Sequence, residues 1–205
     1  MADTYLRQSP LAHLHLDARA GNDAGIDDAG LVMGERRLLG MVNLRGDTAD
    51  PAFAPAAAKA LGVTLPTKAG TVAGDADGVH VLMLGPDEWL AVTPAGAEGG
   101  LTDALAEATV ALYAAVTPVG EARTTIRVAG PDARAALNKG CALDLHPRAF
   151  GPGRCAQTIL ARADMTLHQI DDNAYDVIVL RSFAEYVWTW LEDAGREYGV
   201  KVVIT

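Results

Sequence analysis

Apolar and polar residues alternate over short stretches that occur at corresponding places in the two halves of this chain. In the first half, Leu38–Leu44 alternates and is followed by Gly46, and Pro51–Leu61 then reads as an alanine-rich helix. In the second half, Thr124–Asp132 has the same pattern around Gly130, and another alanine-rich helix follows it. Alternation with a period of two predicts a strand, whereas an apolar stripe with a period near 3.6 predicts a helix. Each half is therefore predicted to begin with a strand and a helix.

Each half then continues with a predicted strand hairpin and a second helix. In the first half these elements cover residues 79–92 and 101–116, and in the second half they cover 165–180 and 183–197, before a short final strand at Val200–Ile204. Gly46 corresponds to Gly130, 84 residues later, and Trp89 corresponds to Tyr175, 86 residues later. The near-constant spacing indicates an internal duplication with a period too long for a solenoid.

Two helix starts carry capping signals. Asp50 is a candidate N-cap with Pro51 at the first helical position, where a missing N–H costs nothing. Ser182 is a candidate N-cap for the last helix, and Glu185 completes a capping box. The apolar stripe of that helix, which excludes Trp188, is predicted to consist of Phe183, Val187, Trp190 and Leu191.

Strand, helix, strand, strand and helix is the order of a split β-α-β, or ferredoxin-like, module. The sequence therefore predicts an α+β protein made of two tandem ferredoxin-like modules, at 37–118 and 119–205, that pack as one folding unit. Residues 1–36 are predicted to form an N-terminal arm and loop. In it, Leu11–Asp17 alternates like a strand, and residues 18–34 read as an irregular loop rich in Gly, Asp and Ala.

Composition narrows the classes of function. The chain has 205 residues, of which 50% are hydrophobic, and a net charge of −9, so nucleic acid is not an expected partner. No N-terminal segment has the features of a signal peptide. The longest apolar tract, Leu101–Val116, contains two acidic residues and is shorter than the ~20 residues that a membrane span needs. Two cysteines make no disulfide framework. We expect a cytoplasmic protein without membrane association.

Histidines and cysteines suggest two metal sites, each with a plainer alternative. His13 and His15 would share one face of the predicted N-terminal strand, as metal ligands sometimes do, but polar residues on an edge strand give the same pattern. A second set has the right ligand types for zinc but lacks a C-x-x-C spacing, and incidental histidines with buried thiols explain it better. This second set is Cys141, His146, Cys155 and His168. We predict no metal site in this chain.

Adjacent carboxylates occur at the two predicted hairpin turns, Asp87-Glu88 and Asp171-Asp172. A converging pair could serve as general acid and base, but neighbours on a turn usually point apart, and Asp favours hairpin tips through local hydrogen bonds. No Gly-rich phosphate loop and no G-x-S-x-G elbow is present. We therefore predict neither catalytic nor cofactor-binding residues.

The segment 139–154 contains several basic residues, together with prolines and glycines that favour turns, in an otherwise acidic chain. Its charged side chains can form a partner-recognition loop, or the segment can be an ordinary surface loop, and the sequence leaves both interpretations open. The candidate interface residues are Lys139, Asp144, His146, Arg148 and Arg154, together with Asp87 and Trp89 at the first hairpin tip.

Several motifs together resemble the gamma subunit of bacterial heterotetrameric sarcosine oxidase. The most specific is G-P-D-A-R-A-A-L-N-K-G-C-A-L-D-L-H-P-R-A-F-G-P-G-R-C-A-Q-T at 130–158. L-R-G-D at 44–47, A-L-G-V-T-L-P at 60–66, L-G-P-D-E-W-L at 84–90 and R-S-F-A-E-Y-V-W-T-W-L at 181–191 agree with it. The resemblance covers roughly residues 36–199.

The resemblance implies a role in a complex that demethylates sarcosine oxidatively to glycine, hydrogen peroxide and formaldehyde or 5,10-methylenetetrahydrofolate. It implies alpha, beta and delta subunits as partners. It places FAD, FMN, NAD, tetrahydrofolate and zinc on those subunits, with none in this chain. It also implies a fold like the folate-binding domain of aminomethyltransferase, the T-protein of the glycine cleavage system. No catalytic residue is implied for this chain.

A different class of function stays open from the residues themselves. A stand-alone folate or one-carbon binding protein would need an apolar cleft with one or two acidic groups to hold a pterin, and Asp144 and Glu121 are the nearest candidates. A free-standing metal or nucleotide sensor has no motif in its favour.

Overall fold

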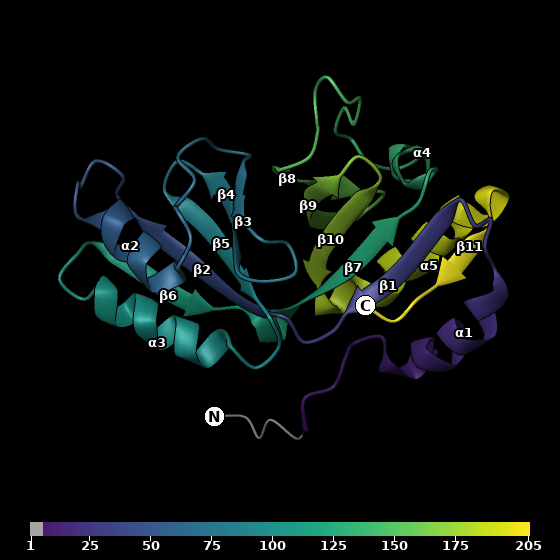
Figure 1. Ribbon diagram of the computed structural model, residues 1–205, viewed down its shortest axis with the longest axis horizontal. Helices are drawn as coiled ribbons and strands as arrows, with labels where there is room; N and C mark the ends of the chain where they lie inside the picture. Colours follow the sequence, from purple (N-terminus) through teal and green to yellow (C-terminus); the bar gives the residue numbers. More distant parts are fainter. Residues whose placement is uncertain (1–5) are drawn as a thin grey trace. The chain divides into compact units, whose positions relative to one another are not determined.

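The computed structural model describes residues 6–205, which form two compact units, each built on its own β-sheet (Figure 1). The five-stranded unit comprises Leu39–Glu121 with the short piece Gly153–Ala156. The six-stranded unit comprises the described residues up to Leu38, together with Ala122–Pro152 and Gln157–Thr205. These boundaries lie close to the predicted start of the first module at residue 37 and its predicted end at residue 118.

The five-stranded unit has the strand order β3-β4-β5-β2-β6, and all its paired strands are antiparallel. Without β3, this is the order 2-3-1-4 of a ferredoxin-like module, so the predicted fold class is confirmed for this half. Its elements are β2 (Gly40–Gly46), α2 (Phe53–Leu61), β3 (Val72–Gly74), β4 (His80–Gly85), β5 (Glu88–Thr93), α3 (Glu98–Ala108) and β6 (Ala114–Pro118).

A core of aromatic and aliphatic side chains lies between this sheet and the helices α2 and α3, which pack side by side in Figure 1. The rings of Phe53 and Trp89 pack with their centroids 5.5 Å apart. The indole N–H of Trp89 donates a hydrogen bond of 2.9 Å to the backbone carbonyl of Pro66, so the polar end of this buried ring is satisfied. Gly46 is needed next to this core, because a Cβ there would overlap the Phe53 ring.

The six-stranded unit has the strand order β11-β1-β7-β10-β9-β8. β7, α4, β9, β10, α5 and β11 repeat the ferredoxin-like arrangement, and β1 is inserted between the first and last strands of that pattern, parallel to β11. Its elements are α1 (Leu16–Asn22), β1 (Leu31–Arg36), β7 (Arg123–Ala129), α4 (Ala133–Asn138), β8 (Arg154–Leu160), β9 (Ala163–Asp171), β10 (Ala174–Leu180), α5 (Ala184–Gly195) and β11 (Val200–Val202).

The N-terminal prediction was wrong in its secondary structure. The segment predicted as a strand at 11–17 forms a 3₁₀ turn and the start of α1, and the segment predicted as a loop contains the rest of α1 and most of β1. Leu11 and Leu16 are buried, and Met33 on β1 pairs in register with Val128 on β7. Burial of these apolar side chains in the six-stranded unit overrides a short alternating pattern.

Two other predictions for helices also need correction. The helix predicted at 101–116 ends at Ala108, and its last part forms β6, where β-branched Val116 packs on the core. On α5 the buried face is shifted: Val187, Trp188 and Leu191 are buried, whereas Trp190 is half-buried and Phe183 is exposed. Trp188 therefore takes the inward place that the sequence pattern assigned to Trp190.

The predicted N-cap residues both precede the observed N-caps, Asp50 by two residues and Ser182 by one. α2 begins at Phe53, but Asp50 accepts a hydrogen bond of 2.9 Å from the backbone N–H of Ala52 and so orders the preceding turn. Ser182 lies in a 3₁₀ turn before α5 and makes no capping hydrogen bond. Gly62 ends α2 in the left-handed conformation. Among residues 6–205, no helix is long and apolar enough to cross a bilayer.

Candidate functional site

Part of the predicted recognition segment forms an exposed loop of the six-stranded unit, held by local hydrogen bonds and two buried anchors. The Asp144 carboxylate accepts a hydrogen bond of 2.9 Å from the backbone N–H of His146, whose ring Nδ1 lies 3.2 Å from the backbone N of Arg148. Leu145 and Phe150 are buried and tie the loop to its unit. The structure therefore brings three of the predicted interface residues together with their side chains at the surface.

Lys139 is placed differently, just after α4. Its ammonium group forms an ion pair with Glu197, donates to the carbonyl of Ala194 and lies 4.6 Å from the centre of the Tyr198 ring. The hydrogen bond to Glu197 raises the pKa of Lys139 above its usual value. The cation therefore joins α4 to the end of α5 within the six-stranded unit.

Arg154 and the hairpin-tip candidates belong to the five-stranded unit. Arg154 forms an isolated β-bridge with Thr71. Asp87 is exposed at the β4–β5 turn, and its carboxylate lies 3.2 Å from the guanidinium of Arg45, which also pairs with Glu88 at 2.9 Å. Trp89 is fully buried, so it can support this turn but does not present its own ring at the surface.

The second carboxylate pair also has a local structural role. Asp171 accepts a hydrogen bond of 2.8 Å from the backbone N–H of Asn173, and the backbone carbonyl of Asp172 accepts one of 2.9 Å from Arg134. These contacts order the β9–β10 hairpin, which is the role that the turn chemistry predicted for Asp171.

Neither cysteine has the properties of a nucleophile or a thiolate ligand. Cys155 is buried with its sulfur 3.6 Å from the carbonyl of Thr71 and 3.7 Å from that of Met83, and burial raises its pKa to about 12. Burial also raises the pKa of Cys141. Both thiols therefore stay protonated near neutral pH. In the part of the chain that the structure describes, no cluster of three potential metal ligands includes either of them.

His13 and His15 do not share a strand face either. His13 lies in a 3₁₀ turn with its Nε2 3.3 Å from the Glu185 carboxylate, and His15 follows it in the left-handed conformation. The metal interpretation of these two residues depended on a strand that the structure does not contain.

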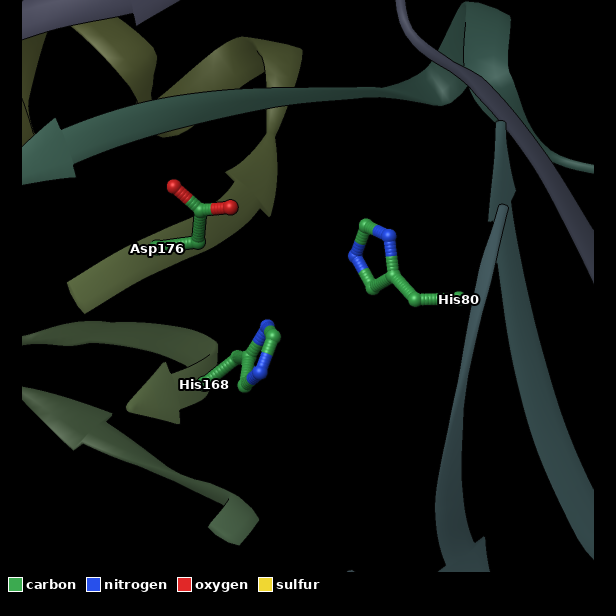
Figure 2. A group of neighbouring side chains, drawn as sticks. All are labelled: His80, His168 and Asp176. Atoms are coloured by element: carbon green, nitrogen blue, oxygen red, sulfur yellow. The ribbon is translucent and has the colours of Figure 1, made fainter. Parts of the chain in front are cut away.

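Sequence reasoning missed a buried ion cluster in the six-stranded unit. Asp176 on β10 lies opposite Arg127 on β7, and its carboxylate is 2.6 Å from the Nε of Arg127 and 2.6 Å from the Nη1 of Arg36 on β1. Asp176 is also in register with His168 on β9, and Figure 2 shows these two side chains on their adjoining strands. His80, drawn in the same view, belongs to β4 of the five-stranded unit. The signal in the sequence was a lone carboxylate inside the apolar strand 174–180.

A second buried carboxylate, Glu35 on β1, binds the N-terminal segment to the same unit. Its oxygens accept hydrogen bonds from the hydroxyls of Ser9 and Thr124, the latter at 2.7 Å, and it lies 3.7 Å from the Nε of Arg37. Arg37 in turn makes two parallel hydrogen bonds of 2.8 and 2.9 Å to Asp17. Both buried carboxylates are thus engaged by cations or hydroxyls of neighbouring elements, as buried charges generally are.

The chain is thus a duplicated ferredoxin-like protein, and its two buried carboxylates make contacts within the six-stranded unit. The chain shares its fold with the glycine cleavage system aminomethyltransferase T from Bartonella henselae, with a TM-score of 0.71 at 14% identity over 97% of this chain and 59% of that one. Residues 45–197 match the model of the sarcosine oxidase, gamma subunit family, and the chain belongs to that family.

Two further comparisons agree over the whole chain. The chain is 36% identical to the sarcosine oxidase subunit gamma of an Arthrobacter species, over 98% of this chain and 95% of the relative. It superimposes with a TM-score of 0.85 on a chain of the heterotetrameric sarcosine oxidase from Corynebacterium sp. U-96 in complex with pyrrole 2-carboxylate, at 33% identity, covering 94% of this chain and 96% of that one. The resemblance inferred from the motifs is therefore confirmed.

Proposed function

We propose that this chain is the non-catalytic gamma subunit of a cytoplasmic, heterotetrameric sarcosine oxidase, assembled with alpha, beta and delta subunits. The observation that carries the proposal is the near-complete superposition on a chain of such an oxidase, at 33% identity. In this proposal FAD, FMN, NAD, tetrahydrofolate and zinc are held by the other subunits.

The chemistry of the chain supports the non-catalytic part. The two thiols have raised pKa values, and the two buried carboxylates are engaged by arginines or hydroxyls inside one unit. A general acid or base needs reach to a substrate proton and a nucleophile needs an activating base, and these groups serve structural contacts instead.

Purification of the tagged chain from its native host tests the assembly. Flavin absorbance in the eluate and hydrogen peroxide production that depends on sarcosine are the expected results. A colourless chain that elutes alone and binds tetrahydrofolate would contradict the proposal and favour a stand-alone folate-binding protein, for which Asp144 and Glu121 were the sequence candidates.

A second experiment tests the absence of catalytic residues. Complexes that carry Cys141→Ser or His146→Ala should oxidise sarcosine at the wild-type rate per bound flavin. Loss of a general acid–base group lowers rates by about 10²–10⁴-fold, so a drop of that size in a fully assembled complex would overturn this part of the proposal.

On the six-stranded unit, the proposed docking surface is the exposed loop with Asp144, His146 and Arg148. On the five-stranded unit, the proposed docking residues are Asp87 and Arg154. Charge reversal by Arg148→Glu or Arg154→Glu should weaken assembly. The effect should be larger at low salt, because dissolved ions screen charges at the rim of an interface. Arg162→Glu, at the β8–β9 turn, is the matched control. Unchanged assembly of both variants would remove these residues from the interface.

A further inference from the structure

The two sheets end in four outer strands, and three of these make at least one backbone hydrogen bond or bridge to another part of the chain on their outer side. On β3, the backbone N–H of Val72 donates 2.9 Å to the carbonyl of Gly153, and the N–H of Cys155 donates to Gly70. β8 is bridged at Leu160 to Cys141.

On β11, the third of these strands, the backbone N–H of Val202 donates a hydrogen bond of 2.9 Å to the carboxylate of Asp23. The ammonium group of Lys201 donates to the carbonyl of Ile26. Natural proteins cover sheet edges in this way, because a bare edge is a template for another strand.

β6 is the exception, since no segment within residues 6–205 pairs with its outer side. The register fixes which backbone groups lie there. The backbone N–H of Val119 donates a hydrogen bond of 2.7 Å to the carbonyl of Met41. In an antiparallel pair every second residue bonds to the same neighbouring strand, so Ala115 and Thr117 exchange hydrogen bonds with β2. The N–H and C=O groups of Ala114 and Val116 therefore point away from the sheet.

Exposed apolar side chains stand at the start of this edge. Tyr113 is 93% exposed and Val110 is 83% exposed, the two highest values among the exposed large hydrophobic residues described. A hollow of about 710 Å³ lies beside Tyr113 and is lined in part by Tyr113, Ala114 and Ala115. Exposed aromatic side chains beside unpaired backbone groups are features of a docking site.

The charges around the hollow indicate the chemistry of the occupant. Asp47 and Asp87 both line it, and Arg45, the cation that also lines it, is already paired with Asp87 and with Glu88. The two carboxylates that line the hollow outnumber its one guanidinium, so the site is negative. A basic side chain on the incoming segment would complement it.

The geometry points to β6 as the place where an extended segment of a partner subunit adds a sixth strand to this sheet. Its backbone binds Ala114 and Val116, an apolar residue packs on Tyr113 and Val110, and a Lys or Arg meets Asp47. This inference rests on the proposed role as an oxidase subunit and names the surface that one partner uses.

Amide hydrogen exchange of wild-type protein tests the inference with a control inside the strand. In the isolated chain, the N–H groups of Ala114 and Val116 should exchange quickly, whereas those of Ala115 and Thr117 are protected by β2. In the purified oxidase complex, Ala114 and Val116 should become protected as well, by about tenfold or more. Fast exchange of both in the complex would overturn the inference, and so would protection that rises with the concentration of the isolated chain, which would indicate a second copy.

Two variants test the contacts. Val116→Pro removes an N–H that β2 does not use, and should weaken assembly by about tenfold. Because the change also removes core packing of the Val116 side chain, assembly is measured well below the melting temperature of the isolated variant. Asp47→Lys should weaken assembly at low salt, and Asp28→Lys, an exposed carboxylate of the six-stranded unit, should not. If the wild-type chain itself captures no flavoprotein, the proposed function fails. If the wild-type chain and all three variants assemble equally, only the β6 site fails.

Discussion

Trp89 and Tyr175 hold the same position in the two units. Trp89 on β5 pairs with Leu44, two residues before Gly46, and Tyr175 on β10 pairs with Val128, two residues before Gly130. Both rings are fully buried, and both direct a polar atom to a partner of their own unit: the Trp89 indole donates to Pro66, and Arg134 donates 3.0 Å to the Tyr175 hydroxyl. The duplication therefore preserved a large aromatic ring at the centre of each sheet, with different polar partners.

The Trp89 position gives a prediction about stability. Trp89→Ala should lower the free energy of unfolding by about 3–5 kcal/mol, because it leaves a cavity beside Phe53 and an unpaired carbonyl at Pro66. Urea denaturation followed by circular dichroism measures this change. Tyr113→Ala, at a fully exposed ring, should change the value by less than about 0.5 kcal/mol. Equal effects of the two changes would mean that Trp89 is not a core residue.

Asp176 allows a test of the buried ion cluster. Asp176→Asn removes the charge that faces Arg36 and Arg127, two largely buried cations, and should cost about 3–5 kcal/mol of the free energy of unfolding. Asp87→Asn, in an exposed pair with Arg45, should cost no more than about 1 kcal/mol. Denaturant midpoints of both variants, measured side by side, decide the matter. A neutral effect of Asp176→Asn would show that the cluster contributes nothing net to folding.

Features that depend on local sequence patterns could be predicted from the sequence, whereas features that depend on contacts between distant segments could not. The duplicated fold could be read from the sequence, because its strands and helices have strong local periodicity and Gly46 and Gly130 mark the same turn. β1 could not, since its pairing with β7 joins residues about ninety positions apart along the chain. The clusters around Asp176 and Glu35 depend on the same long-range pairing. Loop 144–148 was identified by composition, which indicates exposure but not the shape of the loop.

Gly46 and Gly99 form a matched pair for a packing prediction. Gly46→Ala should destabilise the protein by about 1–3 kcal/mol, because the new Cβ overlaps the Phe53 ring in a filled core. Gly99→Ala lies in α3 with open space around it, and should stabilise the protein by about 0.5–1 kcal/mol, since Ala loses less backbone freedom in a helix. Thermal unfolding of the two variants should thus shift in opposite directions. A shift in the same direction would contradict the packing described at Gly46.

Cys155 predicts a pH dependence of stability. Its pKa is about 12 in the folded chain and 9.0 as a model thiol, so the unfolded chain loses this proton first as the pH rises. The contribution of the buried thiol is fully present below about pH 9 and is lost progressively between pH 9 and about pH 12, with a limiting slope of about 1.4 kcal/mol per pH unit. Wild type and Cys155→Val should therefore differ in the slope of the free energy of unfolding against pH above 9, and run parallel below it. Parallel curves across the whole range would show that this thiol titrates alike in the folded and unfolded chains.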